Sequence, residues 1–416
     1  MKPTAGGRRT SGSRGGNGGR AMTEAALPAW HKEAEAHKRA MPLQRLAGNG
    51  MDYADVVELY ARVDRGQPWA EAAGVLGDRN SARAEQALTA GHLATARGWH
   101  LLAAACYRVG QVPLADDDPG KTDLYRRLID QYGRAGVLFD PAVERIEVDY
   151  AGGALCGWLL RPATARTTGG PPPVVIVMGG FDGWREEYHV GATYLLERGI
   201  AALLVDGPGQ GESRSFHGLH LDPSVDEAFS AIVDHLWADD RLAQIVGIWG
   251  NSMGGYLAAL AAATDDRIDA CCVNGGTTRP AEILDRYPGF ITKIMPLLGV
   301  HAPERARAAL ARFELTPELL DRLRCPLLVL HGTPDQVFLI ENARALFDAA
   351  ASTNKTFREW PDGDHCITNH SHEKHVVLAD WFADQLLAPS PASSTYSDEA
   401  PTGSTDLTHS GRTAQR

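Results

Sequence analysis

The stretch GIWGNSMGGYLAAL, residues 247–260, constrains the fold more than any other part of the sequence. The run IVGIW is short, β-branched and aromatic, which predicts a buried strand, whereas the following YLAALAAA consists of good helix formers. Ser252 therefore falls at a turn from strand to helix, with Gly250 and Gly254 on either side. Such a G-x-S-x-G turn lifts a serine hydroxyl above the end of a sheet. A glycine-rich turn that serves only packing could show the same G-x-S-x-G pattern, so the motif needs support from the rest of the chain.

Short apolar segments alternate with helical segments over the second two thirds of the chain. The expected strands are a hairpin of RIEVDY and ALCGWLLRP, followed by PPVVIVMGG, AALLVDGPG, QIVGIWG, DACCVNGG, CPLLVLHG and NKTFREW. This order predicts an α/β fold with a doubly wound, mostly parallel sheet. Residues 277–324 lie between the sixth and seventh strands and predict a helical insertion.

The N-terminal part has a helical pattern and no convincing internal repeat. Its expected helices are DVVELYARV, WAEAAGVLG, ARAEQALTAGHLATARGWHLLAAACYRVG and KTDLYRRLIDQYGRAG. Two ends rich in Gly, Ser, Thr or Pro predict disorder, and Met22 offers an alternative start to Met1. The predicted divisions are a tail at 1–28, a helical cap region at 29–140, a catalytic α/β domain at 141–388 and a second tail at 389–416.

Composition excludes several classes of function. The formal net charge is −11, and residues 1–21 carry five basic groups and no acid, so the rest of the chain is more acidic than the whole. No basic face is visible in it, and we expect no nucleic-acid partner. We find no apolar run of the roughly 20 residues that a membrane span needs, and we expect no membrane partner. The six cysteines lack C-x-x-C spacing, which indicates a reducing, cytoplasmic location. The sequence leaves the oligomeric state open, with a homodimer as one option.

Two later loops supply the partners that a nucleophilic serine needs. A serine hydroxyl requires a base, and the base requires an acid that orients it, in the chain order Ser, Asp or Glu, His. Asp335 follows the strand PLLVLHG, and His365 follows the last strand, in DGDHCITN. Taken alone, Asp335 suits a turn aspartate and His365 a surface histidine. Their order and strand positions together predict a triad of Ser252, Asp335 and His365.

The loop after the third expected strand, GGFDGWREEYH, is the candidate oxyanion loop. The backbone N–H groups of Phe181 and Met253 are the expected donors to an oxyanion, and Gly180 would let the backbone approach a substrate closely. Glu187 is a candidate substrate contact, and an acid that favours a helix N-terminus explains it equally well. Cys366 adjoins the proposed base and is expected to serve packing.

We expect neither cofactor nor metal. The loop DGPGQGE lacks both the G-x-G-x-x-G spacing and a Walker lysine. His365 and the later histidines, His370, His372 and His375, lack a supporting cluster of Cys or Asp ligands. Because the loop DGPGQGE lacks these nucleotide-binding features, we assign it to a tight turn beside the active site.

Five segments taken in order, GGFDGWREE, LLVDGPGQGES, GNSMGG, VLHGTPDQV and DGDHCITNH, resemble the α/β hydrolases of the fermentation-respiration switch esterase and 2,6-dihydroxypseudooxynicotine hydrolase-like family. The resemblance covers about residues 120–388 well and the helical region more loosely. It implies that Ser252 is the nucleophile, Asp335 the acid and His365 the base. It also implies that the helical region and a lid formed by the insertion cap the pocket.

The resemblance defines the catalytic machinery better than the substrate. The leading hypothesis is a serine-triad hydrolase that cleaves an ester, or a C–C bond next to a ketone, in a small and largely apolar metabolite that is polyketide-like or aromatic. Alternatives are a lyase of secondary metabolism that eliminates a carboxylate such as acetate, and a noncatalytic binding protein, against which the intact triad argues. Glu282 and Tyr287 of the insertion are further candidate substrate contacts, although no motif aligns Glu282 with the family's substrate-binding glutamate. The insertion's apolar residues suit a pocket wall or simple core packing.

Overall fold

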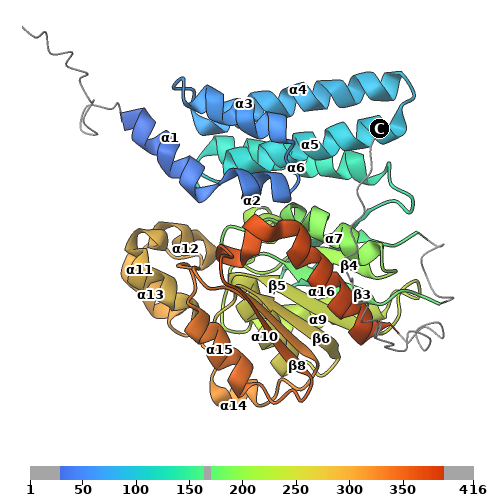
Figure 1. Cartoon of the computed structure of the whole chain (residues 1–416), viewed down its shortest axis with the longest axis vertical. Helices are drawn as coiled ribbons and strands as arrows, with labels where there is room; N and C mark the ends of the chain where they lie inside the picture. The colour runs from blue at the N-terminus through green and yellow to red at the C-terminus, as the bar shows by residue number, and fades with distance from the viewer. Residues whose placement is uncertain (1–28, 164–169, 388–416) are drawn as a thin grey trace, which may run out of the picture.

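The computed structural model describes residues 29–163 and 170–387. A sheet of eight strands forms its centre, in the order β1-β2-β4-β3-β5-β6-β7-β8 (Figure 1). The strands are β1 (Glu144–Tyr150), β2 (Gly153–Leu160), β3 (Val174–Met178), β4 (Ala201–Asp206), β5 (Val246–Asn251), β6 (Ile268–Asn274), β7 (Leu327–Gly332) and β8 (Lys355–Trp360). All the predicted strands are confirmed, whereas the predicted tails lie outside the described residues.

The central strands are apolar throughout because helices cover both faces of the sheet. Strand β2 pairs antiparallel with β1 and β4, and all other neighbouring strands are parallel. Alternate residues of β3 enter opposite cores: Ile176 packs with α9 and α10, and Val177 with α7 and α16. The covering helices are α7 (His189–Leu196), α8 (Gly211–Ser215), α9 (Val225–Trp237), α10 (Met253–Thr264), α15 (Ile340–Ala349) and α16 (Ser371–Leu386).

In the part of the chain that the structure describes, six helices precede the sheet and form a separate layer, which lies at the top of Figure 1. They are α1 (Ala29–Ala40), α2 (Leu43–Gly48), α3 (Tyr53–Val63), α4 (Trp69–Thr89), α5 (Leu93–Gln111) and α6 (Pro119–Gly136). The predicted boundaries inside this region were wrong, because α4 continues through Gly77 and the break falls near Gly91. A Cβ at Gly77 would lie 2.4 Å from the Tyr107 ring of α5, so this glycine permits close helix packing instead of ending a helix.

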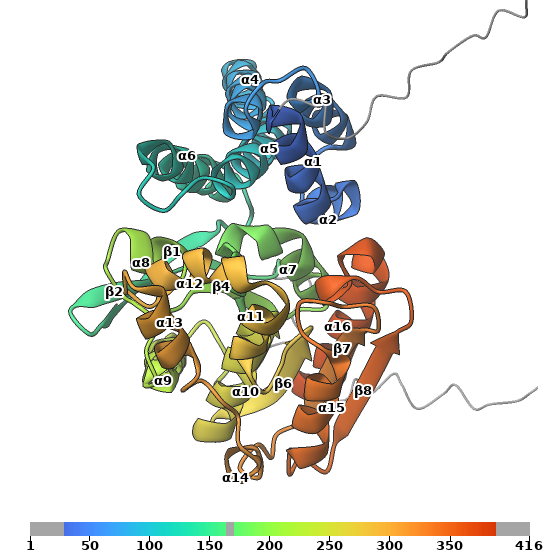
Figure 2. The ribbon, with the colours of Figure 1, turned by 90° about the vertical axis from the view of Figure 1, so that its left-hand side faces the viewer.

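The helical region lies beside the α/β domain and contacts it through α2 and α6, among other elements (Figure 2). Helix α2 lies against α16 and the turn η6 (His365–His370), while α6 packs its aromatic side chains on the sheet, with the rings of Tyr132 and Trp158 5.2 Å apart. The turn η6 contains the proposed base. The N-terminal helices therefore reach the loops that carry the candidate catalytic residues.

The insertion between β6 and β7 is helical, as predicted. It consists of η4 (Pro280–Glu282), α11 (Ile283–Arg286), η5 (Pro288–Phe290), α12 (Ile291–Leu297), α13 (Pro303–Leu310) and α14 (Pro317–Leu320). Ile283, Ile294 and Leu297 are buried in the same core as α9 and α10, so much of its apolar surface serves core packing.

All six cysteines carry free thiols, and five of them are buried. None of the helices in the described ranges combines the length and apolar character needed to cross a bilayer.

Candidate active site

Ser252 occupies a strained turn between β5 and α10. Its backbone has φ 60° and ψ −126°, a conformation that is rare for residues other than glycine. A Cβ at Gly250 would lie 1.8 Å from the carbonyl oxygen of Gly254, and one at Gly254 would lie 2.4 Å from the carbonyl oxygen of Gly179. Both glycines of the G-x-S-x-G motif are therefore sterically required. The turn holds the Ser252 side chain at the carboxyl ends of the parallel strands.

Three loops bring Ser252, His365 and Asp335 together. The Ser252 Oγ lies 2.8 Å from His365 Nε2, and His365 Nδ1 lies 2.7 Å from Asp335 Oδ2. Both are hydrogen-bond distances, and they use the two opposite nitrogens of one imidazole. If Nδ1–H donates to the carboxylate, Nε2 is left as the acceptor for the serine hydroxyl proton. This arrangement can activate a serine nucleophile.

Asp335 is fixed by its own loop. Its Oδ1 accepts hydrogen bonds from the backbone N–H groups of Val337 (2.7 Å) and Phe338 (3.3 Å), and the residue is only 2% exposed. Burial alone would raise the pKa of Asp335, but the attraction of His365 and its hydrogen bond outweigh burial and lower that pKa. Asp335 therefore stays ionised across the neutral range.

The interaction between Asp335 and His365 shifts the pKa of the base, His365, in the opposite direction. Burial alone would lower the pKa of His365, but the Asp335 carboxylate outweighs burial and holds that pKa well above its usual value. The His365 ring also meets the edge of Phe338, with ring centroids 5.9 Å apart. A basic imidazole in a partly apolar setting suits proton transfer in both directions of an acyl-transfer reaction.

Three polar residues that the sequence did not single out support this arrangement. The carbonyl of Asn274 accepts from the Ser252 backbone N–H at 2.9 Å, and its Nδ2 donates to Asn251 Oδ1 (2.8 Å) and to the carbonyl of Cys366 (3.1 Å). The buried ammonium of Lys374 donates to the same carbonyl of Cys366 at 3.1 Å. Asn274 thus ties the serine turn to the histidine loop. Its place after an apolar strand was the only sequence signal.

The histidine loop itself is strained. Cys366 and Ile367 have φ values of 59° and 56°, in the left-handed region that a β-branched side chain such as isoleucine strongly disfavours. The Cys366 Sγ is buried 3.6 Å from His365 Nε2 and also 3.6 Å from the carbonyl oxygen of Asn274. The two bonds to the Cys366 carbonyl hold the loop in this conformation.

The predicted oxyanion loop lies directly against the serine turn. A Cβ at Gly180 would lie 2.7 Å from the Ser252 Cβ, so only glycine fits there. Met253 begins α10, where backbone N–H groups have no partner within the helix, and Phe181 follows Gly180 in the chain. Gln210 was missed by the sequence analysis: its Nε2 donates to the carbonyls of Gly179 (2.6 Å) and Gly180 (3.1 Å) and so holds the loop.

Glu187 joins two parts of the molecule. Its Oε1 accepts from Asn49 Nδ2 at 2.6 Å and from the Arg45 guanidinium at 3.4 Å, and Arg108 Nη1 lies 3.5 Å from its other oxygen. All three partners belong to the helical region. The candidate substrate contact is therefore a carboxylate already engaged in holding the helical region beside the oxyanion loop.

The two candidate contacts of the insertion lie in different environments. Glu282 is 1% exposed and accepts from Thr277 Oγ1 at 2.6 Å and from Arg286 at 3.2 Å. Arg286 in turn donates to the carbonyls of Gln336 and Val337, beside Asp335. Glu282 thus braces the acid loop, whereas Tyr287 is 45% exposed.

Among the described residues, one group of three potential metal ligands comes together, namely Cys156, Glu212 and His217. The Glu212 carboxylate already binds the guanidinium groups of Arg145 and Arg185. Burial raises the pKa of Cys156 to about 12, which keeps its thiol protonated. These residues therefore do not fit a metal ion.

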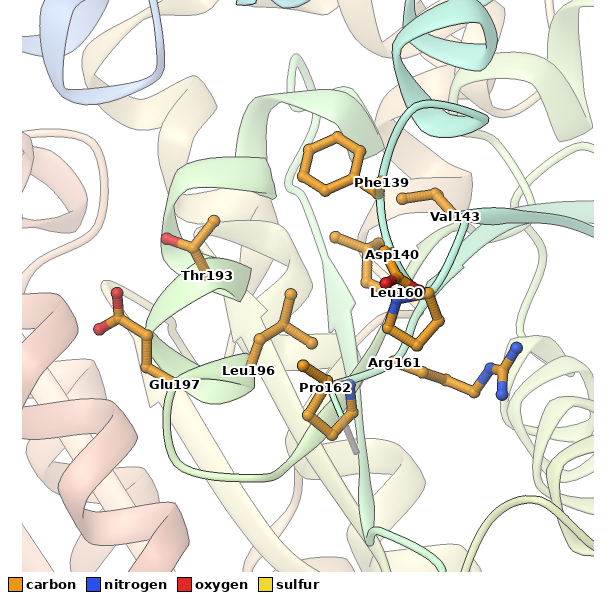
Figure 3. Close-up of a pocket in the computed structure, with 11 residues that line it drawn as sticks. Phe139, Asp140, Val143, Leu160, Arg161, Pro162, Thr193, Leu196 and Glu197 are labelled. Carbon is orange, nitrogen blue, oxygen red and sulfur yellow. The ribbon is translucent and has the colours of Figure 1, made fainter. Parts of the chain in front are cut away.

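A cavity of about 210 Å³ lies where the helical region continues into β1 (Figure 3). Figure 3 shows Phe139, Val143, Leu160 and Leu196 around it, with Arg161 at one side. It shares no lining residue with the Ser252 site. Its apolar walls therefore belong to the junction between the two regions rather than to the candidate active site.

Comparison with known proteins identifies the family. Residues 50–288, more than half of the chain, match the family described as esterase FrsA-like. The chain belongs to the FrsA-like esterase family. The predicted family resemblance and the α/β-hydrolase fold are both confirmed.

This FrsA-like chain is similar to hydrolases from bacteria and fungi. It is 27% identical to 2,6-dihydropseudooxynicotine hydrolase of Paenarthrobacter nicotinovorans over 351 residues, which cover 83% of this chain and 91% of that protein. It is 28% identical to Hydrolase LUC6 of Fusarium sp over 356 residues, 73% of this chain and 83% of that protein. The crystal structure of the 2,6-dihydroxy-pseudo-oxynicotine hydrolase matches with a TM-score of 0.74, covering 83% of this chain and 95% of that one. The protein is accordingly a hydrolase of the α/β-hydrolase family.

Proposed function

We propose that this hydrolase uses Ser252, His365 and Asp335 as a catalytic triad to cleave an ester, or a C–C bond next to a ketone, in a small and largely apolar metabolite. The observation that carries the proposal is the pair of hydrogen-bond distances at His365, 2.8 Å to Ser252 Oγ and 2.7 Å to Asp335 Oδ2, at a strained strand-to-helix turn. Strain of this kind persists only where the surrounding structure maintains it, and it clusters at functional sites.

In the first step the Ser252 Oγ attacks the substrate carbonyl carbon while His365 Nε2 takes the hydroxyl proton. The carbonyl oxygen gains negative charge, and the backbone N–H groups of Phe181 and Met253 are the proposed donors to it. Asp335 stabilises the imidazolium that forms, without itself taking the proton.

In the second step the tetrahedral intermediate collapses to an acyl-enzyme. In an ester, the bond from the carbonyl carbon to the alcohol oxygen breaks and His365 protonates that oxygen. In a ketone with a stabilised neighbouring carbanion, the C–C bond breaks and the proton goes to that carbon. Water, deprotonated by His365, then attacks the acyl-enzyme and releases the acid with free Ser252.

Relatives support the substrate class. The names of two relatives refer to 2,6-dihydropseudooxynicotine and to 20-hydroxy-prefusarin, and the second relative, from Gibberella moniliformis, is 31% identical over 233 residues. We infer that the substrate is a product of secondary metabolism or of the breakdown of such a compound. The Phe181 ring, which contacts the rings of Phe290 and Phe338, suits such a substrate.

The experiment that tests this function follows oxygen from water. Turnover in ¹⁸O-labelled water should place one labelled oxygen in the acid product, because an acyl-enzyme is released by water. Ser252→Ala should be folded and should lose several orders of magnitude in kcat. An unlabelled carboxylate accompanied by a co-product with a new double bond would establish elimination and would contradict the proposal.

A further inference from the structure

A second cavity, of about 250 Å³, lies between the helical region and the loops that follow β3 and β4. Its lining residues come from the loop before α6, from α6 itself, from the end of the oxyanion loop and from α8 with the loop after it. They are Asp116, Lys121, Thr122, Tyr125, Trp184, Arg214, Ser215 and His220. Ligand sites occur preferentially at such junctions between structural units.

Two hydrogen-bond donors in the wall of this cavity have no acceptor among the described residues. The indole N–H of Trp184 and the Nε–H of Arg214 are both buried and have no hydrogen-bond partner among the described residues. Trp184 is 6% exposed and the Arg214 side chain is 9% exposed. Buried donors of this kind cost free energy unless a partner accepts from them. Both nitrogens lie beneath the cavity surface, so a donor that a ligand can reach is the ammonium of Lys121.

The charges of the lining favour an anion. Asp116 contributes the only carboxylate of the lining, and both of its oxygens are engaged by Arg214, at 2.6 and 2.8 Å. The Lys121 ammonium donates to the carbonyl of Leu114 at 3.1 Å and keeps further donors. Burial lowers the pKa of Lys121, and Asp116 and Asp182 offset this only in part. Nearby carboxylates thus do not fully compensate the positive charge of Lys121.

The aromatic side chains favour a flat group. The rings of Tyr125 and Trp184 meet edge to face with centroids 4.5 Å apart, and the Lys121 ammonium lies 5.8 Å from the centre of the Trp184 ring. Aromatic faces stack well on planar conjugated ligands. A benzoate-like carboxylate combines the flat shape, the charge and the acceptor oxygens.

The cavity is joined to the Ser252 site through one loop. Trp184 follows Phe181, the proposed oxyanion donor, by three residues, and Asp182 between them forms an ion pair with Lys293 of the insertion at 2.8 Å. The Phe290 ring next to Lys293 contacts the Phe181 ring, with centroids 5.7 Å apart. The cavity and Ser252 therefore lie on the same edge of the sheet.

We propose that this cavity binds a planar carboxylate and that, in the enzyme's substrate, this is the acidic end distant from the bond that is cleaved. The second part rests on the proposed function, whereas the first does not.

Binding is tested first, by titration calorimetry with benzoate and with its neutral analogue benzamide. The full-length protein should bind benzoate more tightly than benzamide. Lys121→Gln keeps a hydrogen-bond donor but removes the charge, and should weaken benzoate binding by about tenfold or more without changing benzamide binding. Lys32→Gln, at an exposed lysine of α1, is the matched control and should change neither.

A second variant tests the aromatic wall of the cavity. Trp184→Phe keeps a ring but reduces the aromatic wall of the cavity, and it should also weaken benzoate binding. Ser252→Ala should bind benzoate as the unmodified protein does, so this test is independent of hydrolysis. Absence of benzoate binding at millimolar concentration, or equal binding of benzoate by the Lys121→Gln variant, would overturn the site.

The link to catalysis is tested with 4-nitrophenyl esters of (4-carboxyphenyl)alkanoic acids of increasing chain length and with the matching carboxamides. At one chain length the ester that carries the carboxylate should have a KM at least about tenfold below that of the matching carboxamide. Lys121→Gln should remove this difference in KM while leaving kcat in place. If the folded enzyme cleaves the carboxylate-bearing esters and the matching carboxamide esters equally at every chain length, the substrate role is overturned. Equal rates for the unmodified enzyme and Ser252→Ala would instead contradict the proposed function.

Discussion

Helix α2 and the insertion both lie over the candidate active site, but contacts of opposite kinds hold them there. Helix α2 is joined to the catalytic domain through charged and polar groups around Glu187, which accepts from Arg45 and Asn49 and pairs with Arg108. The insertion is joined through Ile283, Ile294 and Leu297, which are part of the same apolar core as α10. Moving the insertion would expose core residues of the catalytic domain to water, whereas the buried residue of α2, Leu46, belongs to the separate core of the helical region.

This difference indicates separate tasks for α2 and the insertion, the two covers of the candidate active site. An apolar anchor is costly to open, because exposing a buried aliphatic side chain costs about 1.5–3 kcal/mol. A junction built from ion pairs can exchange its partners for water at a smaller net cost. We therefore expect the insertion to form a fixed wall and the α2 side to control access, while the chemistry belongs to loops of the catalytic domain alone.

The largest effect should follow from Asp335→Asn, which changes the chemistry without touching either cover. The rate should fall by roughly 10²–10⁴, because asparagine no longer stabilises the imidazolium or the required tautomer. The Asp335 carboxylate raises the pKa of His365, and only neutral His365 can accept the serine proton. The acidic limb of the pH–rate profile should therefore lie above the ordinary histidine value of about 6.5 and move down in the variant. An acidic limb that stays in place would assign the acid to another residue.

The next largest effect should be on stability, from Ile294→Ala in the insertion. Ile294 is completely buried, and truncating such a side chain costs about 2–5 kcal/mol in the free energy of unfolding. Urea denaturation measures this cost. Val137→Ala is the control, since Val137 is 69% exposed and its truncation should change the free energy of unfolding by less than about 0.5 kcal/mol. A similarly small loss for Ile294→Ala would mean that the insertion is not anchored in the core.

A smaller and more local effect should follow from Glu187→Gln. Burial alone would raise the pKa of Glu187, but Arg45 and Arg108 outweigh burial and lower it, so the carboxylate is ionised at neutral pH. Neutralising it leaves Arg108 buried without its counter-charge, and we expect a loss of about 1–3 kcal/mol. Hydrogen exchange should become faster in α2 and remain unchanged in α12.

The control for this variant is Glu58→Gln, which removes a more exposed carboxylate of the helical region. Glu58 pairs with Arg62 at 2.7 Å with its side chain 33% exposed, so its loss should cost less than about 1 kcal/mol. Equal acceleration of exchange in α2 and α12 after Glu187→Gln would contradict the distinction between the two covers. The acidic limb of the pH–rate profile should stay in place in both variants.

The smallest effect is expected for Cys366→Ala. The histidine loop is held through the carbonyl of Cys366, which accepts from Asn274 and Lys374, and these bonds do not involve the thiol. Steady-state kinetics should therefore show a rate within a few-fold of the unmodified enzyme. Selective inactivation by a thiol reagent that this substitution abolishes would show that the thiol has a larger part in the site.

Features coded by neighbouring residues could be predicted from the sequence. The central strands were found because each is an apolar run ended by Gly, Pro or Asn. The serine turn was found because Gly250 and Gly254 are needed within a few residues of Ser252. Asp335 and His365 were identified by their positions after two of these strands. The structure brings all three side chains within hydrogen-bond distance, and their catalytic roles stay predictions.

Features that depend on distant partners could not be predicted. The partners of Glu187 are an example, because Arg45, Asn49 and Arg108 precede it by many residues and meet it only after the helical region packs. The same is true of Asn274, whose bond to Cys366 joins two separate strand ends. Nothing local in the sequence distinguishes such residues from ordinary polar loop residues.

The central claim is that Ser252 is a nucleophile activated by His365, and intact-protein mass spectrometry after treatment with a fluorophosphonate tests it most directly. Such a reagent forms a covalent bond with an activated serine oxygen and loses fluoride. We predict one adduct per chain, located on Ser252 by peptide mapping, with no adduct in Ser252→Ala and much slower labelling in Asp335→Asn. An unlabelled but folded protein, or an adduct on another residue that persists in Ser252→Ala, would contradict the account.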